Sequence, residues 1–135
     1  MKIAFRVDSS KKLGFGHVNR CKILAKNLEK QNISCIFITQ FKQTYDYFLS
    51  EGFHVFLIKN KNEFQQVNQI LKKENCKKLV IDSKRKSIEQ LINNFRKIIK
   101  IILIDNYLNS KFVDLTVISS IKNPRKKYPK NCIVG

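Results

Sequence analysis

The sequence predicts an α/β fold in which helices cover both faces of a parallel β-sheet. Short apolar segments alternate along the chain with longer segments whose apolar residues recur at three- and four-residue spacing. Several of the short segments are apolar throughout, which is typical of strands buried on both sides of a parallel sheet. A chain of 135 residues is long enough to fold as one domain with a substantial core.

The alternation places strands and helices in a regular order. The expected strands cover residues 3–7, 34–39, 54–58, 78–82, 99–104 and, as a shorter one, 114–119. The expected helices cover residues 17–31, 44–50, 62–75 and 87–98. In parallel sheets ligands bind beyond the carboxyl ends of the strands, near the point where the strand order reverses. Because carboxylates end or directly follow three strands, we expect one polar rim that contains Asp8, Asp82 and Asp105.

The formal net charge of +17 leaves two interpretations open. Lysine supplies 22 of the 27 basic residues and is scattered over every segment, which favours a solvated basic surface. The alternative is an electrostatic field that attracts an anionic ligand such as a nucleotide or a phosphosugar. No zinc-finger spacing, arginine-rich stripe or aromatic RNA-binding strand accompanies the charge, so nucleic acid is not an expected partner.

The patterns of cysteine, histidine and apolar residues narrow the class of protein further. Four cysteines at wide, irregular gaps and only two histidines argue against a structural zinc site, and no metal or cofactor is expected. The N-terminus lacks the uncharged run of a signal peptide, and no apolar stretch reaches membrane-spanning length. These features predict a cytoplasmic protein with reduced thiols and no membrane partner.

A loop with two glycines precedes the first expected helix. Gly14 and Gly16 would let the backbone turn sharply and let a ligand approach closely. The helix that follows offers unpaired N–H groups and the positive end of its dipole to an anion. The dinucleotide fingerprint fails because Asn19 stands where its third glycine belongs, and the Gly-Lys-Ser/Thr of the P-loop is absent.

His17 is the candidate base of this loop. It stands in the first turn of the expected helix, where the dipole disfavours the protonated imidazole. A neutral imidazole beside a phosphate-binding loop is what general-base activation of water requires. The alternative is an ordinary N-terminal histidine that only hydrogen-bonds the loop. His54 follows a glycine turn at the start of a strand, and we expect it to be structural.

Each charged residue that could belong to a binding site has a structural and a functional interpretation. Arg6 lies inside a buried strand and needs a carboxylate or a phosphate as a partner. Arg20, one turn into the first helix, could reach an anion or only Asp8. Asp8 could orient the loop or contact a ligand hydroxyl. Asp82 and Asp105 either cap the segments that follow them or contact a ligand.

Five motifs spread over nearly the whole chain carry a family resemblance. They are Arg6-x-Asp8-Ser9-Ser10, Gly14-x-Gly16-His17-x-x-Arg20-Cys21, Val80-Ile81-Asp82, Leu103-Ile104-Asp105-Asn106 and Tyr128-Pro129-x-x-Cys132-x-x-Gly135. Together they resemble the UDP-2,4-diacetamido-2,4,6-trideoxy-β-L-altropyranose hydrolases of pseudaminic acid biosynthesis. The sequence departs from that pattern at Lys84, where the family usually carries an aromatic residue.

The resemblance implies a Rossmann-like domain like the N-terminal domain of a GT-B fold, with the substrate held between two domains. Residues 1–122 would form the N-terminal domain, and residues 123–135 would be an exit linker toward a second domain that supplies most UDP contacts. His17 would activate the water that releases UDP from a UDP-diacetamido-trideoxy-sugar. The residues implied to contact the UDP-sugar are Arg6, Asp8, Gly14, Phe15, Gly16, Arg20, Asp82 and Asp105.

Two main functional hypotheses remain open at this point, and a basic domain associated with nucleic acid is a weaker third. In the first, the chain is the sugar-nucleotide hydrolase or its N-terminal half, with little activity unless a complementing C-terminal domain or chain is present. In the second, it is a non-catalytic or truncated sugar-nucleotide-binding partner domain of a glycosyltransferase-like protein.

Overall fold

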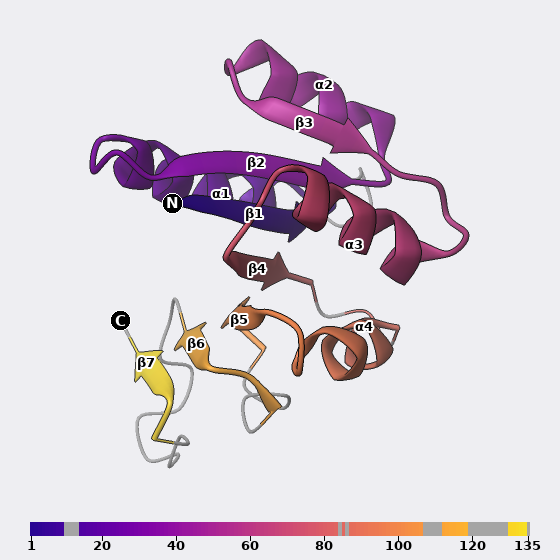
Figure 1. Cartoon of the computed structure of the whole chain (residues 1–135). Helices are drawn as coiled ribbons and strands as arrows, with labels where there is room; N and C mark the ends of the chain where they lie inside the picture. The colour runs from indigo at the N-terminus through magenta and orange to yellow at the C-terminus, as the bar shows by residue number, and fades with distance from the viewer. Residues whose placement is uncertain (10–13, 84, 86, 107–111, 119–129, 135) are drawn as a thin grey trace.

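The computed structural model describes residues 1–9, 14–83, 85, 87–106, 112–118 and 130–134 (Figure 1). Its strands are β1 (Lys2–Val7), β2 (Ser34–Thr39), β3 (His54–Leu57), β4 (Lys78–Asp82), β5 (Lys100–Ile104), β6 (Leu115–Ile118) and β7 (Cys132–Val134). Its helices are α1 (Gly16–Glu29), α2 (Lys42–Ser50), α3 (Glu63–Lys73) and α4 (Ile88–Phe95). In the described part of the chain, the strands form one sheet in the order β3-β2-β1-β4-β5-β6-β7.

The strand order creates a switch point at the centre of the sheet. The chain runs outward from β1 to β2 and β3, then crosses back to place β4 on the other side of β1 (Figure 1). Every pairing is parallel, so all carboxyl ends of the strands lie along one edge. The predicted parallel α/β architecture is therefore confirmed, and its switch point lies between β1 and β4.

The helices divide between the two faces of the sheet, as the two core clusters show. Ile3, Phe5 and Val7 of β1 pack with buried residues of α1 and α2. Ala4, on the opposite face of the same strand, packs with buried residues of α3 and α4. This alternation follows from the two-residue period of a strand, and it decides which charged side chains can meet at the carboxyl edge.

Three helices end in the same hydrogen-bonded turn. Asn32, Gly52 and Asn75 follow α1, α2 and α3 with φ values of 63°, 86° and 54°. In each turn the next backbone N–H donates to a carbonyl five residues earlier, as from Phe53 to Phe48 at 3.1 Å. Asparagine and glycine are the residues that adopt this left-handed conformation readily, so local sequence explains why the helices stop there.

The carboxyl-terminal stretch differs from its prediction. Residues 123–135 were expected to form an exit linker, but Cys132–Val134 form β7, which pairs in parallel with β6. Residues 123–129 and 135 lie outside the described residues. Elsewhere the expected elements are present with ends shifted by a few residues; for example, the helix expected at 87–98 ends at Phe95. Among the described residues, no helix combines the length and apolarity needed to cross a membrane.

Candidate functional site

The candidate site lies at the switch point, where α1 begins over the carboxyl ends of β4 and β5. Asp82 is the last residue of β4, and Asp105 directly follows β5. His17 is the second residue of α1, and Arg20 and Cys21 follow it one turn later. Because the sheet brings these strand ends together under one helix end, segments more than 60 residues apart form a single polar cluster.

The loop that contains Gly14 leads into the N-terminal end of α1. Gly14 has a φ of +77°, a left-handed conformation that suits glycine. Phe15 is the N-cap and makes no side-chain capping bond to the first helical turn. A methyl group added at Gly16 would meet no described atom within 4 Å, so the space beside the start of α1 is open. Among the described residues, nothing therefore crowds the start of α1 next to His17.

His17 and Asp82 form a close pair. Nδ1 of His17 lies 2.5 Å from Oδ1 of Asp82. The Asp82 side chain is 1% exposed and that of His17 is 27% exposed, so the pair is buried at the carboxylate and open at the imidazole. Burial by itself would raise the pKa of Asp82, but hydrogen bonds from Arg20 and His17 hold that pKa below its ordinary value of 3.8.

This geometry specifies the protonation state that the neutral histidine adopts. Nδ1 of His17 has two neighbours with opposite demands: Oδ1 of ionised Asp82 at 2.5 Å only accepts a hydrogen bond, and Nη2 of Arg20 at 2.8 Å only donates one. The shorter contact with the carboxylate favours the tautomer that carries its proton on Nδ1. Nε2 is then the unprotonated nitrogen, and it can accept a proton from a hydroxyl group. The carboxylate would stabilise the imidazolium that results, as in other histidine–aspartate pairs.

Arg20 binds both carboxylates at once. Its Nε donates to Oδ2 of Asp82 at 2.6 Å, and its Nη2 donates to Oδ1 of the same carboxylate at 2.5 Å. Its Nη1 donates to Oδ2 of Asp105. The guanidinium therefore fixes the orientation of Asp82 and joins the ends of β4 and β5. The sequence left open whether Arg20 reaches Asp8; its described carboxylate partners are Asp82 and Asp105.

Cys21 is a member of the cluster that sequence reasoning did not include among the candidate contacts. Its Sγ lies 3.4 Å from Oδ2 of Asp82. Burial raises the pKa of this thiol well above its usual value of 9.0, so the thiol stays protonated and donates to the carboxylate. The sequence carried a signal for this role, because Cys21 is four residues after His17 and therefore lies on the same face of the helix.

A second charged cluster forms on the other face of the sheet. Arg6, whose side chain is 1% exposed, donates from Nη1 to Oδ1 of Asp8 at 2.6 Å and from Nε to Oε1 of Glu63 at 2.9 Å. Nη2 of Arg85 donates to the same oxygen of Glu63. The prediction that buried Arg6 needs an anionic partner is met by Asp8 and Glu63. Sequence reasoning missed Glu63 and Arg85.

The structure thus separates residues that the sequence grouped together. Arg6 shares the β1 face that packs on α3 and α4, whereas Asp82 contacts residues of α1. Among the described residues, no hydrogen bond or ion pair joins Arg6 or Asp8 to His17. His17, Arg20, Asp82 and Asp105 form one polar cluster, while Arg6 and Asp8 belong to the other.

Comparisons with solved structures place the fold among glycosyltransferases. MurG of Acinetobacter baumannii matches with a TM-score of 0.72 and 10% identity, over 98% of this chain and 45% of MurG. A glycosyltransferase from Rickettsia africae ESF-5 matches with a TM-score of 0.68 and 14% identity, over 98% of this chain and 42% of that protein. The fold is that of the Rossmann-like N-terminal domain of GT-B glycosyltransferases. The chain spans less than half of either structure.

Sequence comparisons add no family assignment. No family model matches the chain, and no curated protein matches its sequence. At identities of 10% and 14%, the structural matches show a shared fold and not a shared reaction. The resemblance to the pseudaminic-acid pathway hydrolases stays a prediction.

The His17–Asp82 contact predicts a defined tautomer. We expect neutral His17 to carry its proton on Nδ1, because ionised Asp82 accepts it. Long-range proton–nitrogen NMR spectra measure this directly, with the exposed His54 as an internal reference. A His17 that is protonated on Nε2 at neutral pH would contradict the assignment, as would a His17 signal that Asp82→Asn leaves unchanged.

The two loop glycines are expected to respond differently to alanine. Gly14→Ala places a Cβ at a φ of +77°, so we expect the free energy of unfolding to fall by about 1 kcal/mol. The Cβ that Gly16→Ala adds meets no described atom within 4 Å, and the φ of Gly16 is not positive. We therefore expect an unchanged or slightly higher free energy of unfolding. Urea unfolding of the two variants measures the difference, and equal losses would contradict the loop geometry.

Acid is expected to destabilise the fold through Asp8 and Asp82. Burial alone would raise the pKa of Asp8, but Arg6, Gln40 and Thr39 lower it below 3.8. Because both pKa values are lower in the folded state, the unfolded chain binds protons more readily, and the stabilisation is present above pH 3.8. Urea unfolding should show a falling free energy of unfolding as the pH drops below about 4. As the pH drops, the free energy of unfolding of Asp8→Asn should fall less than that of the unsubstituted chain. A free energy of unfolding that does not decrease in acid would refute the prediction.

Proposed function

We propose that the chain is the nucleophile-activating, N-terminal domain of a glycosyltransferase-like protein that acts on a sugar nucleotide. The His17–Asp82 pair at the start of α1 carries this proposal, because it presents a base at the carboxyl edge of a GT-B-type domain. The 27% exposure of the His17 side chain supports it, because a ligand can approach the imidazole. The fold similarity to two glycosyltransferases supports the transfer of a sugar.

The chemistry would follow from the geometry in one displacement. Nε2 of His17 takes the proton from an acceptor hydroxyl, and the oxygen forms a bond to the anomeric carbon of the sugar nucleotide. The bond between that carbon and the nucleotide diphosphate breaks, and its electron pair leaves with the diphosphate. Asp82, held by Arg20, stabilises the imidazolium. A second domain would complete the nucleotide site, and the coverage of 45% and 42% of the longer solved structures is compatible with one.

A sugar-nucleotide hydrolase is the second candidate. The stretch Gly14-x-Gly16-His17-x-x-Arg20-Cys21 favours it, because this spacing resembles the UDP-sugar hydrolases. The roles of His17 and Asp82 would be the same, with water as the nucleophile in place of an acceptor hydroxyl. The two candidates therefore differ in the nucleophile and share the base.

UDP release separates the two candidates and tests the base. UDP-N-acetylhexosamines are incubated with the chain, with and without sugar acceptors, and with and without a complementing GT-B C-terminal domain. Release that requires an acceptor supports transfer, and release in water alone supports hydrolysis. We expect His17→Ala to slow release by about 10²- to 10⁴-fold, with His54→Ala as the matched control. Equal rates for His17→Ala and the unsubstituted chain would refute the role of His17.

A further inference from the structure

The described side chains around His17 carry a surplus negative charge while the imidazole is neutral. Arg20 supplies one positive charge, and Asp82 and Asp105 supply two negative charges. Cys21 adds a protonated, uncharged thiol. These four side chains come from α1, β4 and the end of β5, the elements that meet around His17. When His17 takes a proton as a base, the positive charge of the imidazolium balances the surplus.

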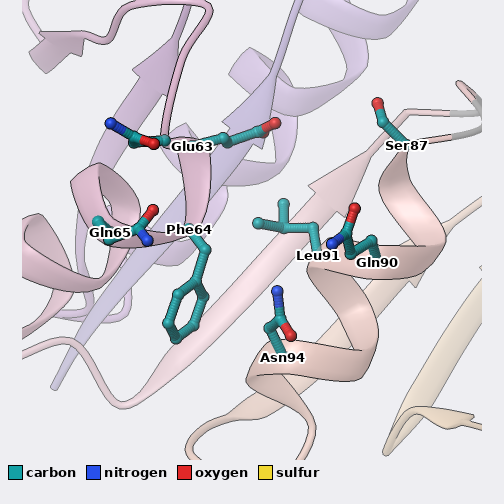
Figure 2. Close-up of a pocket in the computed structure, with 8 residues that line it drawn as sticks. Glu63, Phe64, Gln65, Ser87, Gln90, Leu91 and Asn94 are labelled. Atoms are coloured by element: carbon teal, nitrogen blue, oxygen red, sulfur yellow. The ribbon is translucent and has the colours of Figure 1, made fainter.

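The charged cluster on the opposite face of the sheet has no such surplus. Arg6 and Arg85 pair there with Asp8 and Glu63, so two positive charges meet two negative charges. Glu63 also lines the pocket of about 310 Å³ between α3 and α4 that Figure 2 shows, and none of the four side chains around His17 lines this pocket. The surplus carboxylate therefore distinguishes the cluster at His17 from the other charged cluster of the same sheet.

Asp105 supplies the second carboxylate, and its backbone conformation does not require an aspartate. It directly follows β5 with a φ of 54°, and its N–H donates to the carbonyl of Val117 at 2.8 Å. The other described non-glycine residues with a positive φ are all asparagines, namely Asn32, Asn62 and Asn75. Because asparagine suits this left-handed conformation, an amide would serve the backbone at position 105 as well. The carboxylate thus points to a role of its side chain, and one partner of that side chain is Nη1 of Arg20.

We propose that Asp105 is a positioning residue that acts through Arg20 to stabilise the imidazolium formed when His17 takes a proton. This inference rests on the proposed function of His17. Arg20 forms a bidentate pair with Asp82, and this pair alone would neutralise the carboxylate that faces His17. Asp105 gives the guanidinium a second counter-ion at Nη1, so the charge of Asp82 remains available to the imidazolium. It also holds the guanidinium in place, whose Nη2 lies 2.8 Å from Nδ1 of His17.

NMR titration of the two histidines tests this role without a substrate. We expect Asp105→Asn to move the titration midpoint of His17 to lower pH by about 0.5 to 1 unit, because protonation then leaves the cluster with a net positive charge. Asparagine suits the backbone at position 105, so this variant is expected to fold. Asp105→Glu keeps the charge and should restore most of the shift.

Asp46→Asn is the matched control, because it removes a carboxylate from an exposed ion pair with Lys42. We expect it to leave the titration midpoint of His17 unchanged. The role of Asp105 would be overturned by an unchanged midpoint in Asp105→Asn, by equal shifts in Asp105→Asn and Asp46→Asn, or by a shift that Asp105→Glu does not reduce.

The kinetics of UDP release by the active protein separate positioning from contact with the substrate. We expect Asp105→Asn to lower kcat about tenfold at an unchanged KM, because the imidazolium forms only as the reaction proceeds. A higher KM at an unchanged kcat would assign Asp105 to substrate binding and overturn the inference. The two proposals fail separately. An absent NMR shift with an inactive His17→Ala overturns only the role of Asp105, whereas a fully active His17→Ala overturns the proposed function whatever the NMR shift.

Discussion

Asp82→Asn is expected to inactivate the candidate site and to lower the free energy of unfolding by about 3 kcal/mol. The buried carboxylate has hydrogen bonds from His17, Arg20 and Cys21, and an amide cannot accept them all. If the N–H of the introduced amide faces Nδ1 of His17, the imidazole proton moves to Nε2 and the base is lost. We expect UDP release by the active protein to fall by about 10⁴-fold, the size of effect that a wrong histidine tautomer produces.

Asp46→Asn is the matched control for this substitution. Asp46 is exposed and pairs with Lys42 one helical turn away, so its loss should cost less than about 0.5 kcal/mol. Urea unfolding compares the two variants, and NMR reports the His17 tautomer in the folded fraction. Equal stabilities for the two variants would show that the cluster at Asp82 does not stabilise the fold. An unchanged rate would show that Asp82 does not support the base.

The fold was predictable because each local pattern agreed with the global arrangement. The apolar runs at β1, β2 and β4 and the helical spacing between them indicated a parallel sheet without any knowledge of the strand order. β7 was not predictable, because three apolar residues after a proline-containing stretch have no periodicity. Its strand conformation depends on pairing with β6, which is a contact between segments and not a local preference.

The candidate site was predictable in part for a similar reason. Asp82 and Asp105 end strands, and parallel strands bring their carboxyl ends to one edge, where α1 places His17. The sequence did not predict on which face of the sheet each charged side chain lies, because that depends on which helix covers which face. Arg6 therefore pairs with Glu63, which is 57 residues away in sequence and reaches Arg6 only through the crossover from β3 to β4.

Arg6→Met is expected to be the most destabilising single substitution, with a loss of about 4 kcal/mol. Methionine fills a similar volume, but it leaves the buried carboxylate of Asp8 and that of Glu63 without their shared cation. Arg6 is 1% exposed, whereas Arg20 in the other cluster is 29% exposed and water can partly replace its interactions. Urea unfolding measures the loss, with Arg96→Met as the exposed control.

A double-mutant cycle with Asp8→Asn separates the ion pair from packing. If the 2.6 Å contact between Arg6 and Asp8 stabilises the fold, the double variant will be more stable than the sum of the single losses predicts. Additive losses would instead assign the effect to volume and shape. Arg85→Gln provides the contrast, because the Arg85 side chain is partly exposed and its loss should lower the free energy of unfolding by less than about 1 kcal/mol. A loss in Arg85→Gln as large as the loss in Arg6→Met would contradict the argument from the burial of Arg6.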